Sequence, residues 1–162
     1  MVGGGEMSAE QECQLIIREI VEADQPSWCR LRDALWPGSL SDHELETRHY
    51  FERPHGQLVV FVAERSARVV GFLELDYRKY APGCNSSPVP FIEGWYVEPE
   101  VRGQGIGRAL IEAAEGQARA AGYDEIASDT EIDNVEGIGA HLALGYTETE
   151  RNISFRRSLR DG

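Results

Sequence analysis

The stretch with the clearest chemical potential is a glycine-rich turn that leads into an alanine-rich segment. It reads VRGQGIGRALIEAAEGQARAAGY, residues 101–123, and places Gly103, Gly105 and Gly107 beside Arg102. The first amide N–H groups of a helix have no partner inside the helix, and the helix dipole adds partial positive charge there. A glycine-rich turn that feeds such a helix therefore predicts a site for an anionic group.

Two familiar phosphate-binding patterns do not match this turn. A Walker A loop ends in Gly-Lys-Ser/Thr, whereas this turn ends in Gly-Arg-Ala. The dinucleotide pattern G-x-G-x-x-G needs a third glycine where Arg108 stands. The spacing that remains is Arg102-x-x-Gly105-x-Gly107, after a segment that ends in Val-Glu-Pro at 97–99.

The spacing of apolar residues and turn formers predicts the elements that position this turn. Strands are expected at 14–20, 58–64, 69–77, 91–97, 124–130, 146–151 and 153–159. Helices are expected from Asp24, as a cap, to Pro37, at 41–53, from the glycine turn to Gly122, and at 134–144. Residues 79–90 read as a surface loop. This order predicts one mixed α/β domain over residues 14–162, after a flexible lead-in at 1–13.

The composition limits the classes of function. Among 162 residues, 16 Lys and Arg stand against 28 Asp and Glu, which gives a formal net charge of −12. This acidity disfavours a nucleic acid as partner and favours a cationic one. No apolar run reaches the roughly 20 residues that cross a bilayer, and the N-terminus lacks the features of a signal peptide. We therefore expect a cytoplasmic protein with no membrane partner.

The cysteines predict neither disulfides nor a metal site. Cys13, Cys29 and Cys84 are odd in number and include no C-x-x-C pair. Cys84 lies in the 79–90 loop, but no histidine or aspartate can be argued to activate it as a nucleophile. We expect three reduced thiols.

In its context, the glycine turn resembles the acyl-CoA loop of the GNAT superfamily of N-acetyltransferases. That loop has the pattern Arg/Gln-x-x-Gly-x-Gly/Ala after a strand, and AHLALGY at 140–146 is similar to a family helix that ends in Leu-Gly-Phe. The resemblance covers residues 14–159. It implies the GNAT fold, a mostly antiparallel twisted sheet flanked by helices, with acetyl-CoA as co-substrate. The cofactor-binding residues that it implies are Trp95, Tyr96, Val97, Arg102, Gly103, Gln104, Gly105, Ile106, Gly107, Arg108 and Asn134.

One position departs from the pattern of the superfamily. Many members have a tyrosine that acts as a general acid toward the departing thiolate, and this chain has His141 there. A histidine could donate a proton at that point. A lone histidine on a short helix is more often a packing or surface residue, and the sequence leaves both roles open.

Five separated segments resemble the aminoglycoside 6′-N-acetyltransferases, which acetylate a primary amine of kanamycin-type antibiotics and thereby inactivate them. They are LRDALWPG, GCNSSPV, FIEG, ASDT and ETER, at residues 31–38, 83–89, 91–94, 127–130 and 148–151. The resemblance implies an enzyme that confers antibiotic resistance. It also implies a homodimer, with the final strands as one source of an interface.

The same resemblance implies the residues of the acceptor site. The catalytic residues are Glu93, as a candidate base, and Asp129, which contacts the reactive amine. Carboxylates suit both tasks, because they attract ammonium groups and accept the proton lost on attack. Glu150 is a further substrate carboxylate, and Trp36 and Tyr80 border the sugar, unless these two aromatic residues serve only packing.

Direct transfer in a ternary complex, without a covalent acetyl-enzyme, is the mechanism that we expect. Two other functions fit the same residues. The first is a GNAT enzyme for another small cationic amine such as a polyamine, which turnover on polyamines would identify. The second is a non-catalytic acyl-CoA-binding sensor, which CoA binding without acetyl transfer would identify.

Overall fold

The structure is a computed structural model that describes residues 14–54 and 56–160. The lead-in expected at residues 1–13 lies outside the described residues. The chain divides into two compact units, residues 1–129 and 130–162. Within the described residues, the first unit contains a sheet with helices on both faces, and the second contains one helix, α4 (Val135–Ala143).

The described part of the first unit begins with a strand and two helices and continues with the remaining strands and a third helix. Its elements in chain order are β1 (Leu15–Glu19), the 3-10 turn η1 (Glu22–Asp24), α1 (Gln25–Leu35), α2 (Leu40–Glu52), β2 (Val59–Arg65), β3 (Arg68–Arg78), β4 (Val89–Val97), the 3-10 turn η2 (Pro99–Val101), α3 (Ile106–Ala120) and β5 (Ala127–Ser128).

The strands form one sheet in the order β1-β2-β3-β4-β5. The first three pairings are antiparallel, and β5 pairs with β4 in parallel. The turn between β2 and β3 holds Ser66 and Ala67 at positive φ, as tight hairpins require. The predicted mixed and mostly antiparallel sheet is therefore confirmed.

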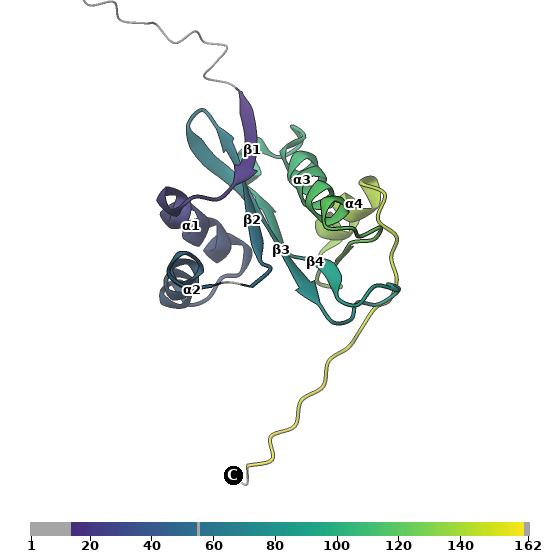
Figure 1. The fold of residues 1–162 in the computed structure, drawn as a ribbon. Helices are drawn as coiled ribbons and strands as arrows, with labels where there is room; N and C mark the ends of the chain where they lie inside the picture. Colours follow the sequence, from purple (N-terminus) through teal and green to yellow (C-terminus); the bar gives the residue numbers. More distant parts are fainter. Residues whose placement is uncertain (1–13, 55, 161–162) are drawn as a thin grey trace, which may run out of the picture. The chain divides into compact units, whose positions relative to one another are not determined.

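Helices cover both faces of this sheet. α1 and α2 lie on one face and α3 lies on the other (Figure 1). Trp28 and Leu31 of α1 are buried in one core cluster with Val60, Val62 and Phe72 of the sheet. Tyr50 of α2 meets the Trp28 ring edge to face, with 5.2 Å between centroids. Burial of these apolar and aromatic side chains stabilises the packing of α1 and α2 on this face of the sheet.

α3 follows directly from the glycine-rich turn. Its buried residues Ile106, Leu110, Ala114 and Ala118 recur every four positions, which gives one apolar stripe that packs on the sheet. Gly122 ends the helix at a φ of 91°, a left-handed conformation that favours glycine. No helix among residues 14–54 and 56–160 is long and apolar enough to cross a membrane.

An ionic cluster joins β1 to the start of α1. Both carboxylate oxygens of Asp24 accept from Arg18, at 2.6 and 2.9 Å, and the same guanidinium donates to Glu64 on β2. Asp24 stands at the N-cap position of α1, but its side chain makes no cap hydrogen bond there. It accepts from the Val21 amide instead, at 2.9 Å. Asp24, which the sequence predicted as a helix cap, therefore serves as an anchor that links β1 to the start of α1.

Two expectations about strands are corrected. The strand expected at 124–130 is only Ala127–Ser128. The strands expected at 146–151 and 153–159 are absent. Residues 146–160 form neither helix nor strand. Ile153, Phe155 and Leu159 are exposed there. Alternating apolar residues stabilise a strand only through cross-strand neighbours, and the alternation does not reveal whether such neighbours exist.

The Asp24 anchor predicts a pH-dependent stability. Hydrogen bonds from Arg18 lower the pKa of Asp24 below its ordinary value of 3.8. The anchor therefore stabilises the fold fully above that value, and its contribution is lost as the pH falls through the lowered pKa. We expect Asp24→Asn to reduce the free energy of unfolding by about 2 kcal/mol at pH 7.

Urea unfolding of both proteins between pH 7 and pH 2.5 measures this difference. It should shrink steadily below pH 4. Glu22→Gln, an exposed charge in the same turn, is the control and should stay close to wild type. A difference that is constant over the whole pH range would show that the charge of Asp24 is not the cause.

Candidate active site

The candidate site is centred on an irregularity in β4. The pairing with β3 passes from Glu74 opposite Gly94 to Leu75 opposite Ile92, so Glu93 is the extra residue of a bulge. β5 pairs with β4 only at Phe91 and Ile92. Among the described residues of this unit, no strand accompanies that edge of β4 beyond the bulge. The part of this edge from Trp95 to Val97 therefore has no strand partner among the described residues of this unit.

The glycine turn has the geometry that its composition predicts. Gly103 and Gly105 have φ angles of 75° and 81°, and Gly105 stands at the N-cap of α3. A Cβ on Gly107 would lie 3.0 Å from Cζ2 of Trp95, so the helix start approaches β4 closely. The first amides of this 15-residue helix have no partner within the helix, and the helix starts beside Trp95 of β4. This arrangement suits a phosphate group.

The side chain of Arg102 stabilises the turn itself. Its Nε donates to the Val97 carbonyl at 2.8 Å, and its guanidinium lies 5.3 Å from the centre of the Tyr96 ring. Gln104 accepts from Arg65 at the end of β2. These contacts hold the turn against the sheet, so its capacity to bind an anion rests on backbone amides and the helix dipole.

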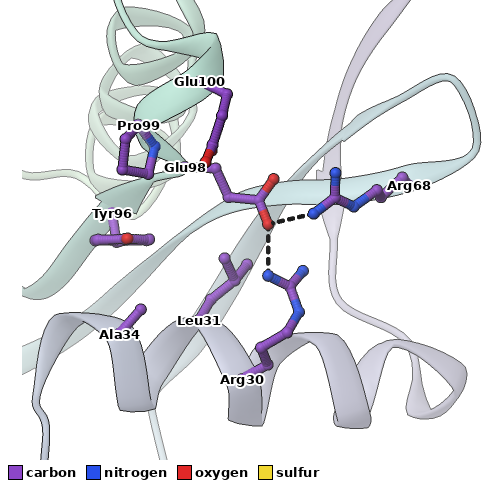
Figure 2. A pocket seen from close by; sticks show the side chains of 8 residues that line it. All are labelled: Arg30, Leu31, Ala34, Arg68, Tyr96, Glu98, Pro99 and Glu100. Carbon is purple, nitrogen blue, oxygen red and sulfur yellow. Dashed lines mark hydrogen bonds and ion pairs between the residues drawn. The ribbon is translucent and has the colours of Figure 1, made fainter.

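A cavity of about 460 Å³ lies between α1 and the end of β4. Its lining residues, shown in Figure 2, are Arg30, Leu31, Ala34, Arg68, Tyr96, Glu98, Pro99 and Glu100. The buried Glu98 accepts from Arg30 at 2.5 Å and from Arg68 at 2.8 Å (Figure 2). Its backbone amide donates to the Val70 carbonyl. Glu98 thus fixes the point where β4 ends and the glycine turn begins.

The two predicted catalytic carboxylates lie close together. Both oxygens of Glu93 accept from Arg78, at 2.8 Å from Nε and 2.7 Å from Nη2. Nη1 of the same guanidinium lies 3.6 Å from a carboxylate oxygen of Asp129, directly after β5. One arginine therefore joins the bulge of β4 to the end of β5. The pair that the resemblance implied is a real spatial cluster.

Trp36 comes to the same bulge from the end of α1. A Cβ on Gly94 would lie only 2.5 Å from Cη2 of the Trp36 ring. His43 of α2 holds the Trp36 carbonyl, and since a carbonyl only accepts, Nε2 of His43 carries the proton of this 2.9 Å bond. The Arg32 guanidinium lies 5.1 Å from the ring centre. Trp36 as a residue is 36% exposed, and its ring lies against Gly94, next to Glu93 in the chain.

Beneath Trp36 lies a buried charge that balances Arg32. Glu74 of β3 accepts from Arg32 at 2.5 Å and from Nε1 of Trp28 at 2.9 Å. Burial raises the pKa of Glu74, and the pairing with Arg32 opposes that rise. The pairing with Glu74 keeps the Arg32 guanidinium beside the rings of Trp28 and Trp36, at 5.5 and 5.1 Å from their centres.

The 79–88 loop is anchored to the rest of the unit. The backbone amides of Asn85 and Ser86 donate to Glu125, and Ala81 packs in a small cluster with Val89 and Phe91. Tyr80, however, is 70% exposed. An anchored loop with one exposed ring agrees with a role in which the ring borders a ligand.

Cys84 does not have the surroundings of a nucleophile. Burial raises the pKa of its thiol, and the charge of Glu125 raises it further. Cys29 is buried, and burial raises its pKa as well. Both groups are therefore protonated thiols at neutral pH. In the described part of the chain, no group of His, Cys, Asp or Glu side chains is placed to hold a metal ion.

The second unit contains the remaining predicted residues. Asn134 caps α4 through the Gly137 amide, at 2.9 Å. Nδ1 of His141 donates to the Gly137 carbonyl at 2.7 Å, so in the neutral ring Nε2 carries no proton. A general acid at His141 would have to be the imidazolium. Glu150 accepts from Asn152 at 2.6 Å.

Sequence reasoning missed Arg78, Glu98 and the Arg32–Glu74 pair. The partners of Glu98 are 68 and 30 positions away, and Glu74 lies 42 positions from Arg32. One signal was present: Glu74 is a charged residue inside the apolar run of β3, where a buried charge requires a partner. Arg78, at the end of the same strand, has no such signal.

Comparisons with known proteins agree with this geometry. Residues 19–146 match the model of the acetyltransferase (GNAT) family. An aminoglycoside N(6′)-acetyltransferase type 1 of Klebsiella aerogenes is 40% identical over 149 residues, with 89% of this chain and 97% of the relative covered.

Two solved structures extend the similarity to the fold. The aminoglycoside N-acetyltransferase AAC(6′)-Iy in complex with CoA is 34% identical, with a TM-score of 0.82 over 90% of this chain and 95% of that one. The same enzyme in complex with the bisubstrate analogue CoA-S-monomethyl-acetylneamine has a TM-score of 0.81 at 34% identity, over 90% and 99%.

The Arg32–Glu74 pair gives a prediction for stability. Glu74→Gln leaves the guanidinium without its buried counter-charge, and we expect a loss of about 3 kcal/mol in the free energy of unfolding. Glu46→Gln is the matched control, because Glu46 pairs with the same arginine but its side chain is 60% exposed. Its loss should stay below about 1 kcal/mol. Equal losses for the two variants in urea unfolding would contradict the role given to burial.

Proposed function

Because the chain belongs to the GNAT family of acetyltransferases, we propose that it transfers the acetyl group of acetyl-CoA to the 6′-amine of an aminoglycoside. The observation that carries the proposal is the meeting of Glu93, Asp129 and the Trp36 ring at one bulge of β4. Two carboxylates beside a ring suit a cationic sugar. The net charge of −12 favours the approach of a polycation, and the names of the relatives support the same acceptor.

The residues around the glycine turn suit the co-substrate. The amides from Gly103 to Arg108 would hold the pyrophosphate at the start of α3, and the open edge of Trp95 to Val97 would hydrogen-bond the pantetheine arm. The close approach of Gly107 to Trp95 brings these two parts together. Acetyl-CoA supplies the acetyl thioester when it is bound. A backbone N–H near Val97 polarises the acetyl carbonyl.

The acceptor side supplies position and a base. Asp129 binds the reactive amine, and Trp36 and Tyr80 border the sugar ring. Glu93, directly or through one water, accepts the proton that the amine loses when its nitrogen bonds to the acetyl carbon. The bond between carbon and sulfur breaks, and CoA leaves as its thiol form after protonation. The protonated thiol of Cys84 supports direct transfer rather than a covalent acetyl-enzyme.

Three further parts of the proposal concern the setting. Acetylation turns an ammonium group into a neutral amide, and antibiotic resistance follows from this lost charge. We place the reaction in the cytoplasm. We also propose a homodimer, which the exposed Ile153, Phe155 and Leu159 support, since apolar residues of this size are commonly covered by a partner.

The first test is the release of CoA thiol from acetyl-CoA with two acceptors. We expect turnover with kanamycin, which has a 6′-amine, and none with paromomycin, which has a hydroxyl group at that position. The reason is that only a neutral amine is nucleophilic enough for direct attack with a carboxylate base. Equal turnover with both acceptors would contradict the 6′ position. Turnover with polyamines alone would favour the other small-amine enzyme, and CoA binding without any transfer would favour the sensor.

A second test concerns Asp129. We expect Asp129→Asn to lower kcat/KM for kanamycin about 10- to 100-fold, which is the range for loss of a hydrogen bond to a charged group. The KM for acetyl-CoA should stay near the wild-type value, because the glycine turn is unchanged. Asp124→Asn, an exposed charge shortly before β5, is the control for the loss of one charge. An unchanged kanamycin profile would remove Asp129 from the site.

A further inference from the structure

The two carboxylates of the acceptor site share a cation that belongs to the protein. Arg78 makes a two-pronged hydrogen bond to Glu93, at 2.8 and 2.7 Å, and its third nitrogen lies 3.6 Å from Asp129. Two negative charges and one positive charge leave this cluster with a net charge of −1. A guanidinium in this fork geometry satisfies the oxygens of Glu93 as a substrate ammonium would.

The position of Arg78 is defined by the sheet. Arg78 is the last residue of β3, opposite Val89, and its guanidinium carbon lies 3.5 Å from the centre of the Phe91 ring. Hydrogen bonding to Glu93 is the largest of the effects that raise the pKa of Arg78, so the side chain is charged at every working pH. The side chain is still 41% exposed, and that of Asp129 is 65% exposed. The guanidinium is therefore ordered by ionic partners rather than enclosed.

The ion pairs of Arg78 limit how Glu93 and Asp129 can interact with a cationic acceptor. Both oxygens of Glu93 are engaged by Arg78, and protonation of Glu93 would weaken that pair. A cationic acceptor that binds to Glu93 or Asp129 competes with a cation already placed there. The exchange costs less than it would in the core, because water reaches both side chains of this partly exposed ion pair and screens it. When an ammonium group takes over the charge balance, the lone pairs of Glu93 become available for the proton.

We propose that Arg78 is an internal competitor for the acceptor's ammonium group, and that binding of the acceptor displaces its guanidinium from Glu93. The inference rests on the proposed function, since it requires that cationic acceptors bind at Glu93 and Asp129. Arg78 is thus a specificity-determining residue. It lowers the affinity of the site for any cation, and an acceptor with several charges overcomes this competition better than an amine with one charge.

The test is the binding of kanamycin to Arg78→Met, measured by calorimetry. Methionine keeps an apolar stem against Phe91 and removes the charge. Because the site then carries −2 instead of −1, we expect the Kd for kanamycin to fall about fivefold at low salt, as expected for one unit charge at about 4 Å in a water-like medium. Arg78→Lys keeps the charge and should stay within about twofold of wild type. Damage to the fold would weaken binding, so tighter binding is not a structural side effect.

A control separates the local effect from the change in net charge. Arg119→Met removes one exposed arginine of α3, which pairs with Glu115 four residues earlier. Its Kd for kanamycin should stay near the wild-type value. An unchanged or higher Kd for Arg78→Met, or an equal fall in both methionine variants, would overturn the proposal.

The wild-type protein offers a second measurement if the methionine variant does not fold. The Nε–H signal of Arg78, assigned from its absence in the Arg78→Lys spectrum, should be visible by NMR while the bond to Glu93 persists. We expect saturating kanamycin to abolish or shift it strongly. A signal that is unchanged at saturation overturns the displacement, while turnover of kanamycin by the same sample leaves the proposed function intact. If wild-type protein neither binds nor acetylates kanamycin, both proposals fall.

Discussion

The pairing of β4 with its two neighbours is the constraint on which the rest of the candidate site depends. β3 accompanies β4 along most of its length, whereas β5 accompanies it at Phe91 and Ile92 alone. The bulge at Glu93 lies just where the second neighbour ends. One side of β4 is thereby held by β3, whereas on the other side the residues beyond Ile92 have no strand partner among the described residues of this unit. A regular strand without the bulge would not have Glu93 as an extra residue of the ladder.

Charge compensation is the second organising feature, and it follows the same two strands. Three carboxylates on or next to β3 and β4 each have an arginine: Glu74 has Arg32, Glu93 has Arg78, and Glu98 has Arg30 and Arg68. Burial decreases from Glu74 to Glu93. The most buried pair lies beside an aromatic ring, while the pair with the most exposed carboxylate lies where chemistry is proposed. An exposed pair is the easier one to open, because water screens it and its net contribution is small.

Much of the fold was predictable because its signals are local. The hairpin of β2 and β3, the helix after the glycine turn and the mixed sheet follow from periodicity and turn residues, and the resemblance to the acetyltransferase family is confirmed. The strands expected after residue 145 were wrong, since alternation shows a face but not a partner. Trp36, Glu93 and Asp129 were named from resemblance, and their functional roles stay predictions. Arg78 and Glu98 were missed because no short-range pattern relates an arginine to a carboxylate many positions away.

The absence of a side chain at Gly94 limits how this site could evolve. The Trp36 ring occupies the space that a Cβ on Gly94 would need. Gly94 and Trp36 lie on different elements, and a larger residue at position 94 requires a change at position 36 as well. A single substitution at position 94 therefore cannot change the surface beside Glu93 unless the Trp36 ring moves. In the proposed acceptor site, new preferences would arise more easily through the loop at 79–88, where Tyr80 is exposed and backbone contacts to Glu125 hold the loop in place.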